Sequence, residues 1–198
     1  MQLALISGIS FCVHNGRFFD RADSYVNDYQ PKVNAFLRFF AAIYRQGESN
    51  PVLLSPTPAG KDVMVLMTHD IDFTRSILNV FDYADYEAAD DVPSTYFIQT
   101  KYVKDFSDDY FFEEARRSDM KKLVSMGMEV ASHTVAHSNL FSSMPPCTGQ
   151  EQYPAYRPFV QNFSAVRDAS ITGELRISKF LLENTTEKPV VSFRPGHL

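Results

Sequence analysis

Three short motifs, each placed directly after an apolar run, most strongly constrain how this chain can fold. They are Thr-His-Asp-Ile-Asp at residues 68–72, Ser-His-Thr-Val-Ala-His at residues 132–137 and Phe-Arg-Pro-Gly at residues 193–196. The apolar runs resemble β-strands, and the segments between them are helical in composition. This alternation predicts parallel βα units, because parallel strands need a crossover connection. Functional side chains gather at the carboxyl ends of such strands, so we expect the motifs to share one edge of the fold.

The expected elements can be placed along the chain from apolar periodicity and from breaker residues. The continuous apolar run at residues 63–67 is typical of a strand buried on both faces. Further strands are expected at residues 94–98, 128–131 and 190–193, and helices at residues 31–45, 74–89, 109–126 and 173–183. Residues 49–60 are rich in Pro and form a predicted connector. The prediction is therefore an N-terminal extension over residues 1–60 and a main domain over residues 61–198.

Composition and charge exclude several classes of protein. A length of 198 residues suits one domain or one domain with an extension, and 44% hydrophobic residues argue against disorder. The net charge of -5 shows no nucleic-acid-binding footprint. Residues 1–13 are mildly apolar, but they are too short to span a membrane and lack the leading positive charge of a signal peptide. No nucleic acid and no membrane span are expected, and the compartment is left unassigned.

Asp70 and Asp72 place two carboxylates near the end of the first predicted strand. If the strand continues, both point the same way, so one can bind a cation while the other stays free as a base. In the alternative interpretation, Asp72 caps the helix that begins near Thr74. A glycosyltransferase uses the same Asp-x-Asp pattern for a metal-bound sugar nucleotide. That reading lacks a Gly-rich phosphate loop in residues 1–60 and leaves the later histidines unexplained.

His133 and His137 form a His-x-x-x-His pair, which would put two imidazoles on one face of a helical turn. Two imidazoles and one carboxylate leave coordination positions open, as is typical of a catalytic metal site. Zn²⁺ is the default ion for this ligand set, with Co²⁺ or Ni²⁺ possible. In the alternative, His133 is a strand-end residue bonded to backbone and His137 is solvated.

Arg194 follows the last apolar run and can hold a catalytic carboxylate by bidentate hydrogen bonds. The alternative is a surface arginine beside a turn. Strand alternation points His69 away from Asp70, which favours a packing or supporting role. His197 lies close to Arg194 in sequence, and the sequence does not decide whether it reaches the site; His14 is treated as non-functional.

A Pro-containing segment after the histidine pair is rich in aromatic residues. Tyr153, Tyr156 and Phe159 lie there, and aromatic rings can stack against a sugar. The segment is expected to be a loop that presents these rings to a carbohydrate.

Together the motifs resemble the polysaccharide deacetylase family, carbohydrate esterase family four. The resemblance covers residues 61–198 and implies a distorted parallel (β/α) barrel. It also implies a metal-dependent hydrolase that removes N-acetyl groups from an acetylated amino-sugar oligomer or polymer. Members often act outside the cytoplasm. By resemblance, Asp70 would be the base and Arg194 the residue that orients it. The metal ligands would be Asp72, His133 and His137.

The chain departs from the family pattern at two places. The commonest first motif has adjacent Asp residues followed by Gly, whereas Ile71 separates the carboxylates here. The chain ends at Leu198, before the family's fourth and fifth motifs, the last of which carries the general-acid histidine. We therefore expect an incomplete barrel and a fragment of a longer protein. Two other functions stay open, a non-catalytic carbohydrate-binding or scaffold domain and a related C–N hydrolase of a small cyclic amide.

Overall fold

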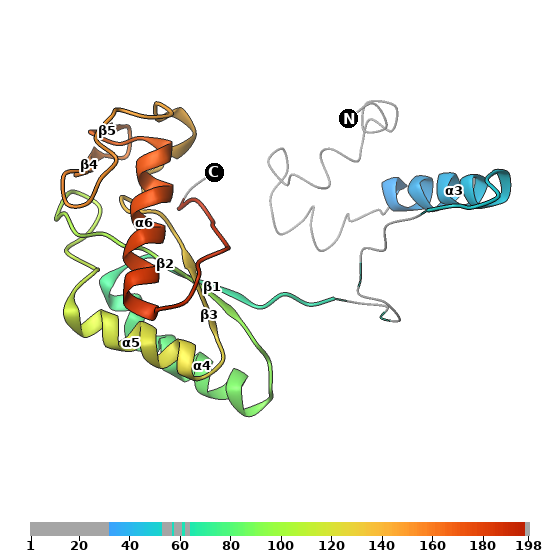
Figure 1. Ribbon diagram of the computed structural model, residues 1–198, viewed down its shortest axis with the longest axis horizontal. Coiled ribbons are helices and arrows are strands. Elements are labelled where there is room, and N and C mark those ends of the chain that lie inside the picture. The colour runs from blue at the N-terminus through green and yellow to red at the C-terminus, as the bar shows by residue number, and fades with distance from the viewer. Residues whose placement is uncertain (1–31, 53–56, 58–60, 62–63, 197–198) are drawn as a thin grey trace. The chain divides into compact units, whose positions relative to one another are not determined.

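The computed structural model describes residues 32–52, 57, 61 and 64–196, and it divides into the compact units Met1–Met64 and Val65–Leu198 (Figure 1). The first contains helix α3 (Lys32–Gly47), close to the helix expected at residues 31–45. The domain boundary at residue 60 stays a prediction. In the described part of the chain, no helix combines the length and the apolar character that a membrane crossing requires.

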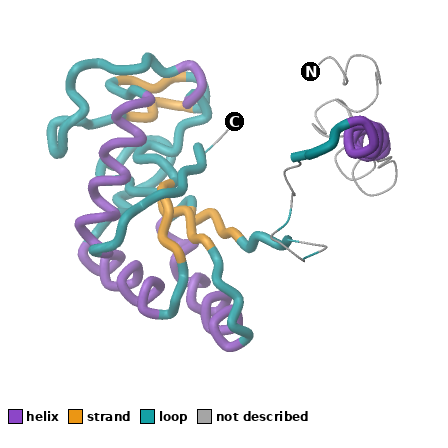
Figure 2. Tube along the Cα trace, turned by 45° about the vertical axis from the view of Figure 1, so that its right-hand side comes forward, coloured by secondary structure: helices purple, strands orange, loops and turns teal. Residues whose placement is uncertain are grey.

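The second unit is built on a three-stranded parallel sheet in the order β1-β2-β3 (Figure 1). The strands are β1 (Thr68–Ile71), β2 (Thr95–Ile98) and β3 (Glu129–Ser132). The helices that follow them are η2 (Thr74–Asn79), α4 (Val80–Ala89), α5 (Glu114–Ser125), η3 (Phe141–Ser143) and α6 (Ile171–Thr186). Figure 2 shows the helices flanking the strands. The predicted α/β class with parallel strands is confirmed.

Strand alternation separates a helix-covered face of the sheet from the face that carries the site. On the helix-covered face, Tyr96 donates a hydrogen bond to Glu87 of α4 at 2.7 Å. On the same face, the hydroxyl of Ser132 lies 2.7 Å from that of Ser178 on α6. Asp70 has the opposite alternation on β1, so its side chain lies on the face turned away from these helices.

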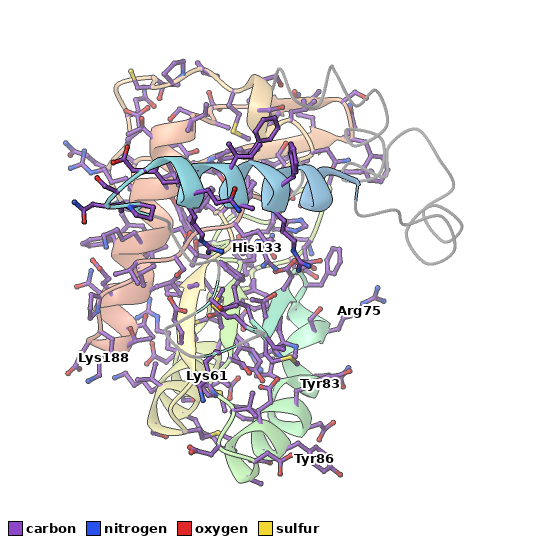
Figure 3. The ribbon with its side chains drawn as sticks, turned by 90° about the vertical axis from the view of Figure 1, so that its right-hand side faces the viewer. Lys61, Arg75, Tyr83, Tyr86, His133 and Lys188 are labelled. Atoms are coloured by element: carbon purple, nitrogen blue, oxygen red, sulfur yellow. The ribbon has the colours of Figure 1, made fainter. Side chains whose placement is uncertain are left out.

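Each helix packs against the sheet through a narrow stripe of apolar residues. Helix α4 buries Val80 and Ala84, while Tyr83 and Tyr86 extend outward from it and are 57% and 78% exposed (Figure 3). Helix α6 buries a longer stripe that includes Ile177, Leu181 and Leu182. Its first turn is capped by Ser170, whose hydroxyl accepts a hydrogen bond from the Gly173 N–H at 3.1 Å. The burial of these stripes against the sheet fixes where the helix ends lie.

The first strand lies later in the chain than predicted. Val65 and Leu66 are 73% and 75% exposed and precede the strand, which begins at Thr68; residue 63 lies outside the described residues. Parallel pairing begins where β2 begins, with Thr68 beside Thr95. The apolar run therefore marks the approach to the sheet, and Asp70 lies inside β1 rather than after it.

The predicted strand at residues 190–193 is reduced to one parallel bridge between Phe193 and Ser132. The Ser132 N–H donates to Ser192 O at 3.1 Å, and the Arg194 N–H donates to Ser132 O at 3.0 Å. Pro195 has no N–H, so it cannot donate to this ladder. The short bridge nevertheless places Arg194 beside the carboxyl end of β3.

Three other elements differ from expectation. The helix expected at residues 109–126 begins only at Glu114, and the one expected at residues 74–89 starts as the 3-10 helix η2. The aromatic segment contains an antiparallel hairpin, β4 (Phe159–Asn162) and β5 (Ala165–Arg167), where only a loop was expected. These strands are too short to show a clear period in the sequence.

Candidate metal centre

Asp72, His133 and His137 converge at the carboxyl ends of β1 and β3. Asp72 Oδ1 lies 3.0 Å from His133 Nε2 and 3.3 Å from His137 Nε2. The imidazole rings meet edge to face with centroids 5.0 Å apart. One ligand atom from each residue lies within 4.8 Å of the other two, which is a spacing that can surround one ion. The three side chains predicted as ligands are thus brought together.

The second ring nitrogen of His133 fixes which nitrogen can bind an ion. Its Nδ1 lies 2.9 Å from the backbone oxygen of Arg194. A carbonyl oxygen only accepts hydrogen bonds, so in the neutral ring Nδ1 carries the proton. The lone pair then resides on Nε2, which faces Asp72. Such a backbone partner is the usual device that orients a metal-binding histidine.

The environment of Asp72 fits a bound cation. Its Oδ1 is buried and has no hydrogen-bond partner among the described residues. When the imidazoles carry a proton on Nε2, their hydrogen bonds, from His133 first and then from His137, hold the pKa of the Asp72 carboxyl well below its usual range, so the group is anionic. An anionic oxygen that faces the lone pair of His133 Nε2 is unfavourable without a shared ion. Two nitrogens and one oxygen suit Zn²⁺ and leave positions open for other ligands.

The loop between the two histidines is not the predicted helical turn. Thr134 and His137 have left-handed backbones, with φ of 70° and 53°. The hydroxyl of Thr134 accepts a hydrogen bond from the His137 N–H at 3.1 Å. The left-handed backbones of these two residues bend the loop so that both imidazoles face the same point. The i, i+4 spacing of a helical turn is therefore not what brings the two rings together.

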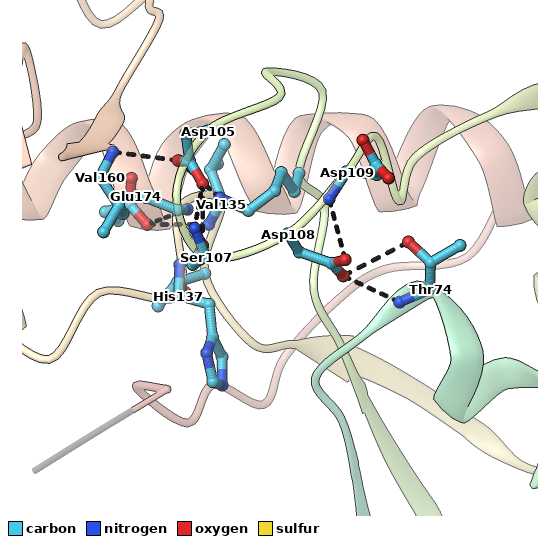
Figure 4. Close-up of polar contacts among 12 residues, drawn as sticks. Thr74, Asp105, Ser107, Asp108, Asp109, Val135, His137, Val160 and Glu174 are labelled. Carbon is cyan, nitrogen blue, oxygen red and sulfur yellow. Dashed lines mark hydrogen bonds and ion pairs between the residues drawn. The ribbon is translucent and has the colours of Figure 1, made fainter. Parts of the chain in front are cut away.

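Glu174 of α6 supports this loop from beneath and was missed by sequence reasoning. Its Oε2 accepts hydrogen bonds from the N–H groups of Val135 and Ala136, both at 2.8 Å (Figure 4). Its Oε1 accepts another from the Tyr156 hydroxyl at 2.7 Å. The carboxylate is fully buried. The available signal was its position on the apolar stripe of α6, where an acidic residue needs a buried partner.

Asp70 and Arg194 form an ion pair next to the three ligands. One guanidinium nitrogen of Arg194 donates to Asp70 Oδ1 at 2.6 Å, and the other donates to Thr68 Oγ1 at 3.1 Å. The predicted bidentate grip on Asp70 is therefore wrong, because the second donor is used by Thr68. The guanidinium also lies over the Phe97 ring, 4.2 Å from its centroid. These contacts hold Arg194 in place and leave Asp70 accessible.

His69 occupies the helix-covered side of β1, as strand alternation predicts. Its Nε2 lies 2.6 Å from Glu87 Oε1, and its ring stacks on Tyr96 with centroids 4.7 Å apart. This histidine belongs to the packing between β1 and α4. His14 and His197 lie outside the described residues.

Two alternatives raised by the sequence are not supported by the contacts. Asp72 does not cap the following helix, because the Thr74 N–H donates instead to Asp108 Oδ2 at 2.9 Å. Tyr156 cannot stack on a sugar, because its ring is 1% exposed and its hydroxyl is engaged by Glu174. Tyr153 is 44% exposed, and Phe159 is partly buried.

The backbone of Gly196, in the third motif, lies close to the His137 ring. A Cβ atom at Gly196 would overlap the His137 imidazole ring. We expect Gly196→Ala to displace this ring and weaken zinc binding by roughly 10- to 100-fold, as for other losses of ligand positioning. Zinc affinity measured by competition with a chelator checks this. Gly47→Ala is the matched control, since nothing lies within 4 Å of a Cβ there; equal losses in both variants would contradict the assignment.

The fold and site define an α/β protein with a candidate Asp-His-His metal centre beside an Asp–Arg pair. The sequence model of the polysaccharide deacetylase family matches residues 58–198, so the chain belongs to this family. The family predicted from the three motifs is confirmed. No curated protein matches the chain.

Solved structures with similar folds include carbohydrate esterase family 4 domains. The Xyl-CE4 domain of a multidomain xylanase from the hindgut metagenome of Trinervitermes trinervoides is 20% identical, with a TM-score of 0.42, over 66% of this chain and 47% of that chain. BA3943, a CE4 family pseudoenzyme from Bacillus anthracis, is 19% identical, with a TM-score of 0.45, over 73% and 41%. The Streptococcus pyogenes deacetylase PplD in complex with acetate is 16% identical, with a TM-score of 0.43, over 79% and 51%. The chain therefore spans about half the length of these structures, or less.

Proposed function

We propose that this chain provides the metal-binding and base-carrying part of a deacetylase that removes N-acetyl groups from an amino-sugar polysaccharide. The observation that carries the proposal is the convergence of Asp72, His133 and His137 beside the Asp70–Arg194 ion pair. A metal site next to a separate, accessible carboxylate is the arrangement that metal-assisted hydrolysis requires. The chain's membership of the family supports the substrate class.

In this proposal Asp72, His133 and His137 would hold the ion. A bound divalent ion would supply Lewis acidity toward the acetyl carbonyl and lower the pKa of a water. The backbone oxygen of Arg194 keeps His133 in the tautomer that leaves Nε2 free for the ion. Zn²⁺ is the proposed ion, and the same donors also suit Co²⁺ or Ni²⁺.

Asp70 is proposed as the general base. Its carboxylate accepts a proton from the water whose oxygen attacks the acetyl carbon, and Arg194 keeps the carboxylate oriented through its 2.6 Å contact. Cleavage of the C–N bond then yields acetate and a free amine. The leaving nitrogen takes up one proton as the C–N bond breaks. The proton that Asp70 accepts from the water balances this uptake.

The test is acetate release from N-acetylglucosamine oligomers by the zinc-loaded protein with the complete catalytic domain and by its Asp70→Asn variant. We expect Asp70→Asn to keep the zinc and to lose about 100-fold or more in turnover, as for loss of a general base. Retained turnover in the variant would show that Asp70 is not the base. A folded, zinc-loaded protein with the complete catalytic domain that binds the oligomers without releasing acetate would favour the non-catalytic carbohydrate-binding alternative.

A further inference from the structure

A pocket of about 250 Å³ opens beside His137. It is lined by three aromatic rings, two amides and the imidazole of a candidate metal ligand: Phe73, Phe106, Phe163, Asn139, Asn162 and His137. The Phe73 and His137 rings meet edge to face with centroids 6.0 Å apart. The pocket therefore shares His137 with the candidate metal centre.

Two of these aromatic rings are unusually open to solvent. Phe106 is 54% exposed and Phe163 is 71% exposed. The rings meet edge to face at 90°, with centroids 5.1 Å apart. This arrangement engages at most one face of one ring, so flat aromatic surface remains available at the pocket. Clustered exposed aromatic surface of this kind marks an interaction site more often than it stabilises a fold.

A buried ion pair holds the two halves of the pocket together. Lys101 Nζ lies 2.7 Å from Asp105 Oδ2, and both side chains are almost fully buried. Asp105 Oδ2 also accepts a hydrogen bond from the Val160 N–H at 3.0 Å (Figure 4). The Phe106 N–H donates to Val160 O at 3.2 Å. Since burying an ion pair gives little net stability, we read its effect as positional. It locks the segment carrying Phe106 to the β4–β5 hairpin carrying Phe163.

The polar groups of the pocket suit a neutral, hydroxyl-bearing ligand. Asn162 lies at a register shift of β4, and its Oδ1 accepts a hydrogen bond from the Ser164 N–H at 2.8 Å. This bond fixes the amide plane and leaves the two Nδ2 protons as donors. None of the described lining residues is Lys, Arg, Asp or Glu. Aromatic faces combined with amides match a sugar ring, which has apolar C–H faces and polar hydroxyls at its rim.

We propose that this aromatic pocket binds one pyranose ring of an amino-sugar oligomer, the ring next to the one whose acetyl group is cleaved. The inference rests on the proposed function for the identity of the sugar. Phe163 supplies the main stacking face, Phe106 supports it, and Asn162 donates to ring hydroxyls. The pocket would thereby place the neighbouring sugar of the oligomer against His137 and the candidate metal centre.

The test is calorimetric titration of the metal-free protein with an N-acetylglucosamine tetramer, which requires no turnover. We expect Phe163→Ala to weaken binding about tenfold, the upper range for one aromatic contact. Phe163→Trp is expected to restore or improve it. Tyr86→Ala is the matched control, because Tyr86 is 78% exposed, against 71% for Phe163, but extends outward from α4 (Figure 3).

The outcomes separate this proposal from the proposed function. Equal affinity in Phe163→Ala and wild type, or no detectable binding by folded wild-type protein, would overturn the pocket assignment. Binding that depends on Phe163, in a zinc-loaded protein with the complete catalytic domain that releases no acetate, would support the pocket while overturning the catalytic proposal.

Discussion

Asp72→Ala is expected to abolish zinc binding while leaving the metal-free fold intact. Wild-type protein should hold about one zinc ion per chain, because two imidazoles and one carboxylate form a complete set of protein ligands. The variant keeps only His133 and His137. Loss of an outer-shell partner alone weakens metal binding by roughly 10- to 100-fold, so loss of the only anionic ligand should exceed about 100-fold. Plasma mass spectrometry after zinc loading and desalting measures the difference.

Two comparisons make this result specific to the proposed ligand set. Asp70→Asn removes a carboxylate only two positions away, outside the Asp72–His133–His137 group, and should keep its zinc. Thermal unfolding of the metal-free proteins should show a cooperative transition for both wild type and Asp72→Ala, so that loss of zinc is separated from loss of the fold. Full zinc occupancy in Asp72→Ala would refute the candidate metal centre.

Of the substitutions considered for this protein, Glu174→Ala is expected to lower the free energy of unfolding most. The change leaves the N–H groups of Val135 and Ala136 without their acceptor and opens a cavity beneath the histidine loop. Each unsatisfied buried group costs about 1–3 kcal/mol, so the free energy of unfolding should fall by roughly 3 kcal/mol or more. Urea unfolding followed by circular dichroism measures it. The loosened loop should also weaken zinc binding through His137.

Glu174→Gln is the matched variant, because its amide oxygen can still accept both N–H bonds and its amide group can donate to Tyr156. Burial raises the pKa of Glu174 above its ordinary value of 4.5, so the folded chain holds this proton more tightly than the unfolded chain does. Wild-type stability should therefore fall, relative to Glu174→Gln, as pH rises above that ordinary value. A constant difference across this range, or an undiminished stability in Glu174→Ala, would contradict the assigned role.

Much of the fold was visible in the sequence because it follows from local patterns. The stripe of α6 and the short apolar run of β2 predicted a helix and a strand close to their observed places. The first strand was misplaced, because an apolar run of residues 63–67 does not show where its neighbour β2 begins. The prediction of a strand at residues 190–193 was wrong for a similar reason. The apolar pattern suggests a ladder of hydrogen bonds, but the structure has a single bridge there, and Pro195 has no N–H to extend it.

The chemistry of the site was predictable by residue type, because few residues bind metals or transfer protons and they stand at the ends of predicted strands. The family, the α/β class and the candidate site residues could all be read from the sequence alone; these residues are Asp70, Asp72, His133, His137 and Arg194. How these residues are held became evident from the three-dimensional fold. It revealed the left-handed histidine loop, the buried Glu174 beneath it, the division of Arg194 between Asp70 and Thr68, and the aromatic pocket. These features depend on contacts between segments far apart in the chain, such as the hydrogen bonds from Val135 and Ala136 to Glu174. Periodicity and spacing report only on neighbours along the sequence, so such contacts leave no local signal.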